Sequence, residues 1–160
     1  NQSLYSWNVS SVTDMGAMFS FAYSFNQPLD SWNVSSVTDM SNMFDHASSF
    51  NQPLNSWDVS SVTDMAFMFW YASFNQPLDK WDVSSVTDMG GMFQGTSSFN
   101  QPLGNWNVSS VTDMTSMFYY SKAFNQPLKN WNLSINTNTN NIFDEASSFD
   151  KKNALWYDFD

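Results

Sequence analysis

Apolar and polar positions along the chain recur with a period of about 25 residues, and a period of this size predicts a repeat architecture. The repeated unit reads L-x-x-W-[ND]-V-S-S-V-T-D-M-x-x-M-F-x-x-A-x-x-F-N-Q-P. Its tryptophans are 25 residues apart, except for one interval of 24 between Trp57 and Trp81, because the turn between Phe69 and Phe74 has lost one residue. The tryptophan column, predicted to be core, comprises Trp7, Trp32, Trp57, Trp81, Trp106 and Trp131, and Trp156 continues it.

The apolar spacing within one unit predicts the path of the chain. Trp57 and Val59 alternate, which predicts a very short strand with both side chains facing inward. Residues 62–69 then place apolar side chains three and four positions apart, the spacing of a short helix, with Thr63 as its N-cap. Asn-Gln-Pro at 75–77 predicts a corner, where the asparagine satisfies backbone groups.

One such coil cannot bury its tryptophan, methionines and phenylalanines alone, so the coils are expected to stack on one another. The sequence therefore predicts a right-handed α/β solenoid of six to seven repeats, similar to a leucine-rich repeat. A narrow parallel sheet would form one face, and short helices would form the other. We expect residues 1–160 to form a single repeat domain, a fragment of a larger protein because the chain begins in mid-repeat. Residues 132–160 are predicted to be a degenerate C-terminal capping repeat, since polar residues replace much of the pattern after Ser134.

The strings FNQPLDSWNVSSVTDMSNMF, FNQPLNSWDVSSVTDMAFMF and FNQPLDKWDVSSVTDMGGMF closely resemble the BspA-like leucine-rich-repeat surface proteins. The resemblance is to the group with a W-D-V-S-x-V-T-x-M-x-x-M-F repeat, and it covers essentially the whole chain. Known members are mostly surface-exposed or secreted bacterial proteins, with relatives in protists and large viruses, and some are implicated in adhesion. The resemblance implies an extracellular, cell-surface or virion-surface location and a binding role.

Composition excludes several classes of function. The chain has 15 acidic residues, five lysines and no arginine, for a formal charge of −10, which disfavours nucleic acids and anionic membranes as partners. No apolar run reaches the ~20 residues of a membrane-spanning helix. The absence of cysteine excludes disulfides and thiolate metal sites. His46 is the only histidine, and the sequence pairs no serine or acid with it, so we expect neither an enzyme nor a cofactor.

Two polar columns have structural interpretations. The first is predicted to cap the helices, because a carboxylate in a first turn favours the helix dipole, although such a ladder could also hold calcium. It comprises Asp14, Asp39, Asp64, Asp88 and Asp113. The second should face outward and could hydrogen-bond from coil to coil. It comprises Asn8, Asn33, Asp58, Asp82, Asn107 and Asn132.

Function is expected in the variable columns, where the repeat permits any residue. Bulky aromatic groups occur there, and aromatic groups with a polar tip are enriched at protein interfaces. The candidate partner-binding residues are Phe21, Phe67, Trp70, Tyr71, Tyr119 and Tyr120, with Gly95 expected to leave a shallow gap between the aromatic pairs. The sequence thus predicts a non-catalytic adhesion domain that binds a protein, a cell-surface ligand or another copy of itself. A passive stalk or filament segment is the alternative, and a carbohydrate- or ice-binding face is weaker.

Overall fold

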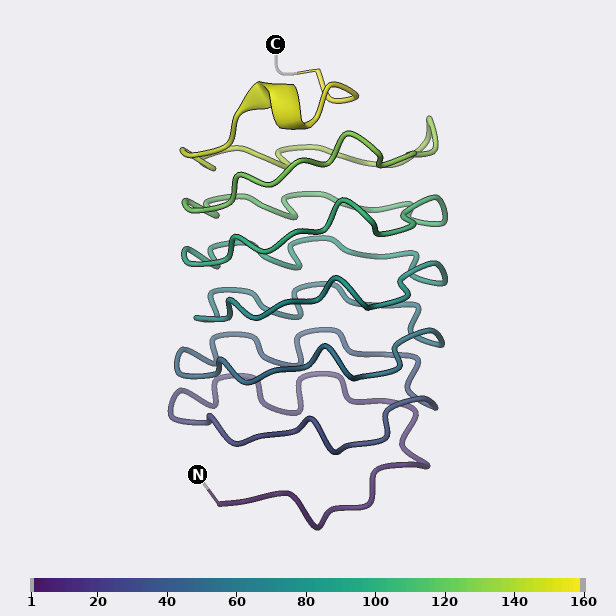
Figure 1. The fold of residues 1–160 in the computed structure, drawn as a ribbon, viewed down its shortest axis with the longest axis vertical. Coiled ribbons are helices and arrows are strands. Elements are labelled where there is room, and N and C mark those ends of the chain that lie inside the picture. Colours follow the sequence, from purple (N-terminus) through teal and green to yellow (C-terminus); the bar gives the residue numbers. More distant parts are fainter. Residues whose placement is uncertain (1, 159–160) are drawn as a thin grey trace.

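The computed structural model describes residues 2–158, which wind through successive coils stacked along one axis, with the two chain ends at opposite ends of the stack (Figure 1). Within these residues the one helix is a 3-10 turn, η1, at Lys151–Asn153. Neighbouring coils are joined by isolated parallel β-bridges of a single residue each. These bridges are Asp14 to Asp39, Asp39 to Asp64, Asp64 to Asp88, Asp88 to Asp113, and Asp113 to Asn138.

The expected α/β solenoid, with a parallel sheet on one face and short helices on the other, is therefore wrong. No named strand and no α-helix is formed in residues 2–158, and the bridges do not extend into a sheet. Almost all of the coil consists of turns and extended connections.

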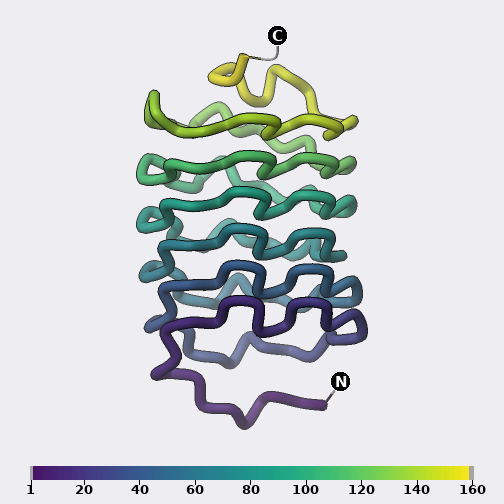
Figure 2. Tube along the Cα trace, turned by 180° about the vertical axis from the view of Figure 1, so that it is seen from behind, coloured from purple at the N-terminus to yellow at the C-terminus, as the bar shows by residue number. Residues whose placement is uncertain are grey.

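Tight turns replace the predicted helix in every coil, as residues 65–72 show. One turn is closed by a hydrogen bond from Met68 N–H to Met65 C=O (3.2 Å), and the next by a bond from Ala72 N–H to Phe69 C=O (3.0 Å). The first and last residue of each turn point inward, so buried positions fall at 65, 68, 69 and 72. This is the i, i+3, i+4, i+7 spacing of a helix, which explains the wrong prediction. The two turns appear as two humps on each coil in Figure 2.

The backbone of this turn segment also bonds to the next coil. The N–H groups of alternate residues Met65, Phe67 and Phe69 donate to the carbonyls of Asp88, Gly90 and Met92 at 2.8–2.9 Å. Every second backbone N–H is thus satisfied across coils, and the residues between them close the turns. The stack is held by these bonds without a sheet.

Aromatic columns fill the interior. In the tryptophan column, each indole Nε1–H from Trp32 to Trp156 donates to the carbonyl of the leucine in the preceding coil, as from Trp57 to Leu29 (2.9 Å) and from Trp106 to Leu78 (3.1 Å). Beside the indoles run two columns of phenyl rings, in which Phe44 stacks on Phe69 with ring centroids 5.6 Å apart. Because each indole N–H finds an acceptor, the large ring is buried without an unsatisfied donor.

The Asn-Gln-Pro corners form an asparagine ladder, which confirms that these residues satisfy the backbone at the bend. The side-chain Oδ1 of Asn51 accepts from the backbone N–H of Asn75 (2.9 Å), and that of Asn75 accepts from Asn100 (3.0 Å). The ladder ends at Asp150, whose N–H donates to Asn125. Asn, unlike Asp in the same place, carries no charge that would accumulate along the column.

The two ends of the stack differ. At the C-terminal end, Trp156 stacks on Trp131 (6.0 Å between centroids), and Leu128 N–H donates to the carbonyl of Asn153 in η1. At the other end Trp7 stacks on Trp32 by one ring face alone, and its side chain is 53% exposed, whereas Trp32 is 4% exposed. The first coil thus leaves core residues uncovered.

We expect Trp57→Ala to lower the free energy of unfolding by about 3–5 kcal/mol, the usual loss for emptying a large aromatic from a core. The matched control is Trp7→Ala, which removes the same side chain from a half-exposed position and should cost less than half as much. Both losses can be measured by urea unfolding. Equal losses for the two variants would contradict the assignment of the tryptophan column to the core.

Candidate binding surface

Four of the six aromatic candidates, Phe21, Phe67, Tyr71 and Tyr120, lie in two columns with an unusual backbone. In each turn the third residue has a positive φ, a conformation that costs a residue with a side chain about 1–2 kcal/mol. The first column comprises Ala17, Asn42, Phe67, Gly91, Ser116 and Asn141, with φ between 54° and 60°. The second comprises Phe21, His46, Tyr71, Gly95, Tyr120 and Glu145, with φ between 49° and 67°.

Glycine and asparagine suit these positions, but large rings do not. Gly91, Gly95 and the asparagines are the residues that left-handed backbone favours. Phenylalanine and tyrosine gain nothing locally from this conformation. Backbone strain of this kind persists only where other interactions require the residue.

In the second column, neighbouring rings stack on one another. The ring centroids of Phe21 and His46 are 4.8 Å apart with planes 15° from parallel, and those of His46 and Tyr71 are 5.3 Å apart. A Cβ atom on Gly95 would lie 2.5 Å from the Tyr71 ring, so this ring covers the glycine of the next coil. The expected shallow gap at Gly95 is therefore wrong, because Tyr71 fills it.

Phe67 and Trp70 are more deeply placed than the second column. The Phe67 ring occupies the space above Gly91, and its centroid is 5.3 Å from that of Trp70. Both side chains are half-buried, and the indole Nε1 of Trp70 is buried with no hydrogen-bond partner in the described residues. These two rings pack the surface of the scaffold and also border the exposed rings.

Tyr119 and Tyr120 form a separate pair two coils further on. Their ring centroids are 6.3 Å apart, and the Nζ of Lys122 lies 4.3 Å from the centroid of the Tyr120 ring. Tyr120 has Gly95 before it and Glu145 after it in its column, so no ring stacks on it from a neighbouring coil. Of the six candidates, Phe21, Tyr71 and Tyr120 are exposed, whereas Phe67, Trp70 and Tyr119 are half-buried.

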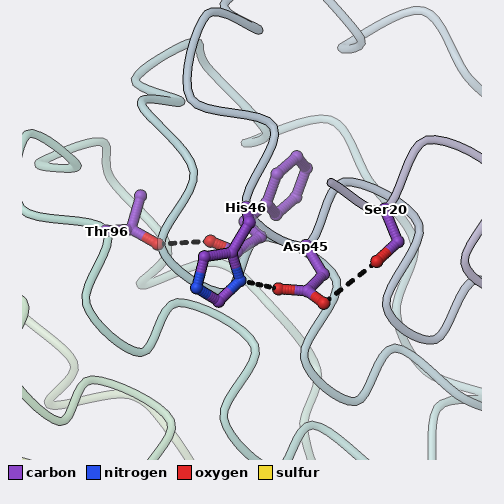
Figure 3. A network of polar contacts seen from close by, with 5 residues as sticks. Ser20, Asp45, His46 and Thr96 are labelled. Carbon is purple, nitrogen blue, oxygen red and sulfur yellow. Dashed lines mark hydrogen bonds and ion pairs between the residues drawn. The ribbon is translucent and has the colours of Figure 1, made fainter. Parts of the chain in front are cut away.

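A polar network that the sequence analysis missed joins Ser20, Asp45 and His46 (Figure 3). Asp45 is buried; its Oδ1 contacts His46 Nδ1, and its Oδ2 accepts a hydrogen bond from Ser20 at 3.0 Å. The expectation that no acid pairs with His46 is thus wrong, whereas Ser20 reaches Asp45 and not the imidazole. The acid is adjacent in sequence, and the 25-residue period brings the serine close. Because Asp45 lies between Ser20 and His46, the imidazole does not contact the hydroxyl, and the network holds the ring in the stack.

The column predicted to cap helices has another role, because no helix begins at any of its aspartates within residues 2–158. Each of these carboxylates accepts a hydrogen bond from the N–H two residues on, as Asp64 does from Ala66 (2.9 Å), and so closes the start of the turn. Burial raises the pKa of Asp64, partly offset by this bond, and the carboxylates of Asp88 and Asp39 raise it further. The last member, Asn138, keeps the same bond to Asn140 without the charge.

The outward column of asparagines and aspartates is built locally, not from coil to coil. The side chain of Asn33 accepts from the backbone N–H and the hydroxyl of Ser35, and Asp58 accepts in the same way from Ser60. The hydrogen bond from the serine hydroxyl lowers the pKa of Asp58, and the corresponding bonds lower that of Asp82. These residues stabilise the turn that leads out of the tryptophan segment.

Other features of the described chain add no reactive group. No three histidine, aspartate or glutamate side chains in residues 2–158 come together as ligands for a metal ion. A hollow of about 340 Å³ at the C-terminal end is lined by Trp131, Ser134, Thr139, Trp156 and their neighbours, none of them charged. Across the part of the chain that the structure describes, every helix is too short to span a bilayer.

Comparison with known proteins gives a family but no characterised relative. The model of a family described as "Mycoplasma protein of unknown function, DUF285" matches residues 1–76 and 52–156. The chain therefore belongs to the DUF285 family, which is consistent with its resemblance to BspA-like repeats. No curated protein and no solved structure matches the chain.

Asp64→Asn should stabilise the protein at neutral pH by about 0.5 kcal/mol. This is the usual gain from removing a repulsion between like charges on neighbouring strands, which here would be neighbouring coils. The pKa of Asp64 is raised in the folded state, so its contribution favours folding at low pH and is lost as the pH rises through that pKa. The gain from Asn should therefore disappear below pH 3.8, the ordinary value, and shrink in high salt. Thermal melts at several pH values measure it; a destabilised variant at neutral pH would contradict the repulsive ladder.

Proposed function

We propose that this member of the DUF285 family is a non-catalytic, surface-exposed repeat domain that binds a partner protein. The contact surface would be the aromatic ridge, defined as Phe21, Phe67, Trp70, Tyr71, Tyr119 and Tyr120. One observation carries the proposal: large rings occupy left-handed positions where glycine would cost the backbone less, and three of these rings are exposed.

Packing accounts for some of these rings but not for all. Tyr71 stacks against His46 and covers Gly95, so its ring also serves the scaffold. Tyr120 has no such neighbour in its column, is 38% exposed, and has φ of 58°. A residue that costs stability and fills no core space is best explained by a contact outside the molecule.

A partner protein fits the ridge better than a sugar does. Binding of a sugar by aromatic groups requires an open ring face, but His46 stacks on Phe21, and Tyr71 packs at a tilt against His46 and covers Gly95. The exposed groups of this surface include the rings of Phe21, Tyr71 and Tyr120, with the ammonium group of Lys122 over the Tyr120 ring. Such a surface combines apolar area with a few polar tips, which is typical of the centre of a protein interface.

The resemblance to BspA-like surface proteins supports placement of the domain outside the cell, on a cell or virion surface. The charge of −10 favours a partner with a neutral or basic face. A passive stalk is the second candidate, because stacked coils give length and rigidity without any partner. The strained aromatic residues count against it.

The ridge can be tested with beads that carry the protein on a surface coated with basement-membrane matrix proteins. Tyr71→Gly together with Tyr120→Gly should reduce bead retention at least about tenfold, the loss expected for truncated interface anchors. Since glycine relieves the left-handed strain, the stability of Tyr120→Gly alone should stay within about 1 kcal/mol of wild type.

The matched control is Thr63→Val with Thr87→Val, which removes two hydroxyls of an exposed column and retains the aromatic ridge. It should bind as wild type does. Loss of retention in the threonine variant alone would favour the hydroxyl-rich face, and hence the carbohydrate-binding alternative. Absence of retention for wild type would favour the passive stalk.

A further inference from the structure

A hollow of about 280 Å³ opens where the Asn-Gln-Pro corners of two neighbouring coils meet. These are the fifth and sixth coils, which contain Trp106 and Trp131. The hollow is lined by Pro102, Gly104 and Asn105 from the fifth coil and by Pro127, Lys129 and Asn130 from the sixth. None of these residues belongs to the aromatic ridge, so the hollow is a separate feature.

Between the third and fourth coils, the side chain of Asn55 fills the equivalent place. Its Oδ1 accepts from the backbone N–H of Lys80 (3.0 Å), and its Nδ2 donates to Asp79 (3.0 Å). In the fifth coil the same column holds Gly104, which has no side chain to reach the sixth coil. A Cβ atom there would lie 2.8 Å from the carbonyl oxygen of Pro127, so the close approach of the two backbones requires glycine.

The missing side chain leaves a backbone donor unused. Asn130 is the equivalent of Lys80, and its N–H donates to no group in residues 2–158. An oxygen atom placed as the Oδ1 of Asn55 is placed in the earlier pair of coils would accept this hydrogen bond. The hollow therefore offers a position for an oxygen acceptor that the protein itself does not supply.

The hollow also carries a positive charge without an internal partner. Lys129 forms no ion pair with the described residues, and it occupies a column that holds Asp30 and Asp79 in earlier coils. Of the carboxylates in the described chain, none lines the hollow. The segment η1, which bonds to the sixth coil beside this corner, adds Lys151 and Lys152. An anionic oxygen is favoured over a neutral one, because hydrogen bonds to a charged group are roughly twice as strong.

We infer that this hollow, which we call the corner site, binds the carboxylate of a terminal acidic sugar. The carboxylate accepts from the Asn130 N–H and pairs with the ammonium group of Lys129. The side-chain amides of Asn105 and Asn130 each combine donors with an acceptor, which suits the hydroxyl groups of a sugar ring. The rings of Pro102 and Pro127 supply the apolar part of the lining, against which the sugar ring packs.

A single acidic sugar suits the corner site better than an acidic peptide does. Pockets for drug-sized ligands have volumes of about 300–1,000 Å³, so a hollow of about 280 Å³ holds one ring. Its lining contains no aromatic side chain, whereas the centre of a protein interface is enriched in them. The net charge of −10 repels a long polyanion over the rest of the surface, which favours one acidic sugar at the end of a neutral glycan.

The test is a titration of the ¹⁵N-labelled 160-residue protein with sodium glucuronate, followed by the NMR signals of its backbone amides. The signals of Gly104, Asn105 and Asn130 should shift together and saturate, with a Kd on the order of 1 mM at low salt, as expected for one small ligand. Glucose has the same ring without the carboxylate, and acetate has the carboxylate without the ring. Each should bind at least about tenfold more weakly than glucuronate.

The variant Lys129→Gln should weaken glucuronate binding at least about tenfold. The matched control is Lys80→Gln, which removes another exposed lysine of a corner segment, one whose backbone N–H already donates to Asn55. It should bind glucuronate as wild type does. Equal losses in the two variants would overturn the inference and indicate that glucuronate responds to net charge alone.

Absence of a saturable shift at Asn130 in wild type would also overturn the inference. Acetate binding as tightly as glucuronate would remove the sugar from it, because the ring would then contribute nothing. A short glutamate-rich peptide that shifts Asn130 at lower concentration than glucuronate would make an acidic protein the occupant. The aromatic ridge takes part in none of these measurements, so the two proposals fail separately.

Discussion

The structure depends on one arrangement of backbone hydrogen bonds, in which alternate N–H groups of a turn segment donate to the carbonyls of the next coil. Buried peptide groups must be paired, and in residues 2–158 nearly all of them are paired with neither an α-helix nor a sheet. The cost is a left-handed third residue in each of the two tight turns of this segment. The gain is that each coil is bonded to its neighbour in a fixed register, which places identical side chains above one another. All of the columns follow from this register.

The columns differ in what repetition does to them. Each added coil further stabilises the columns of stacked tryptophans and phenylalanines, because the rings gain neighbours and the indole N–H groups gain leucine carbonyls as acceptors. Each added coil also stabilises the column of corner asparagines, because its backbone N–H donates to the asparagine side chain of the preceding coil. The aspartate column differs: burial raises the pKa of Asp64, and the carboxylates of Asp88 and Asp39 in the neighbouring coils raise it further. The substitution of asparagine at position 138 shows that the turn needs the oxygen and not the charge.

The left-handed columns connect the scaffold with the proposed functions. Because the backbone there disfavours side chains, each large residue present must be compensated by packing or by an external contact. Phe21, His46 and Tyr71 obtain part of that compensation from one another. Tyr120 obtains less packing compensation, since no ring of a neighbouring coil stacks on it within its column. Tyr5 and Tyr23 of the first coil lie in columns that hold polar residues or glycine in other coils, so the repeat does not require them. Departures from the repeat are therefore the places where this molecule differs from a uniform stack.

By itself the sequence determined the repeat period, the residues that alternate inward and the asparagine ladder, because each of these depends on a local pattern that recurs. The identity of the turn segment could not be derived from it. Buried residues at 65, 68, 69 and 72 satisfy a helix and a pair of tight turns equally, and only the hydrogen bonds to the next coil distinguish the two. The pairing of Ser20 with Asp45 and the covering of Gly95 by Tyr71 were likewise decided by tertiary structure, since both join residues about 25 apart that meet only when the coils stack.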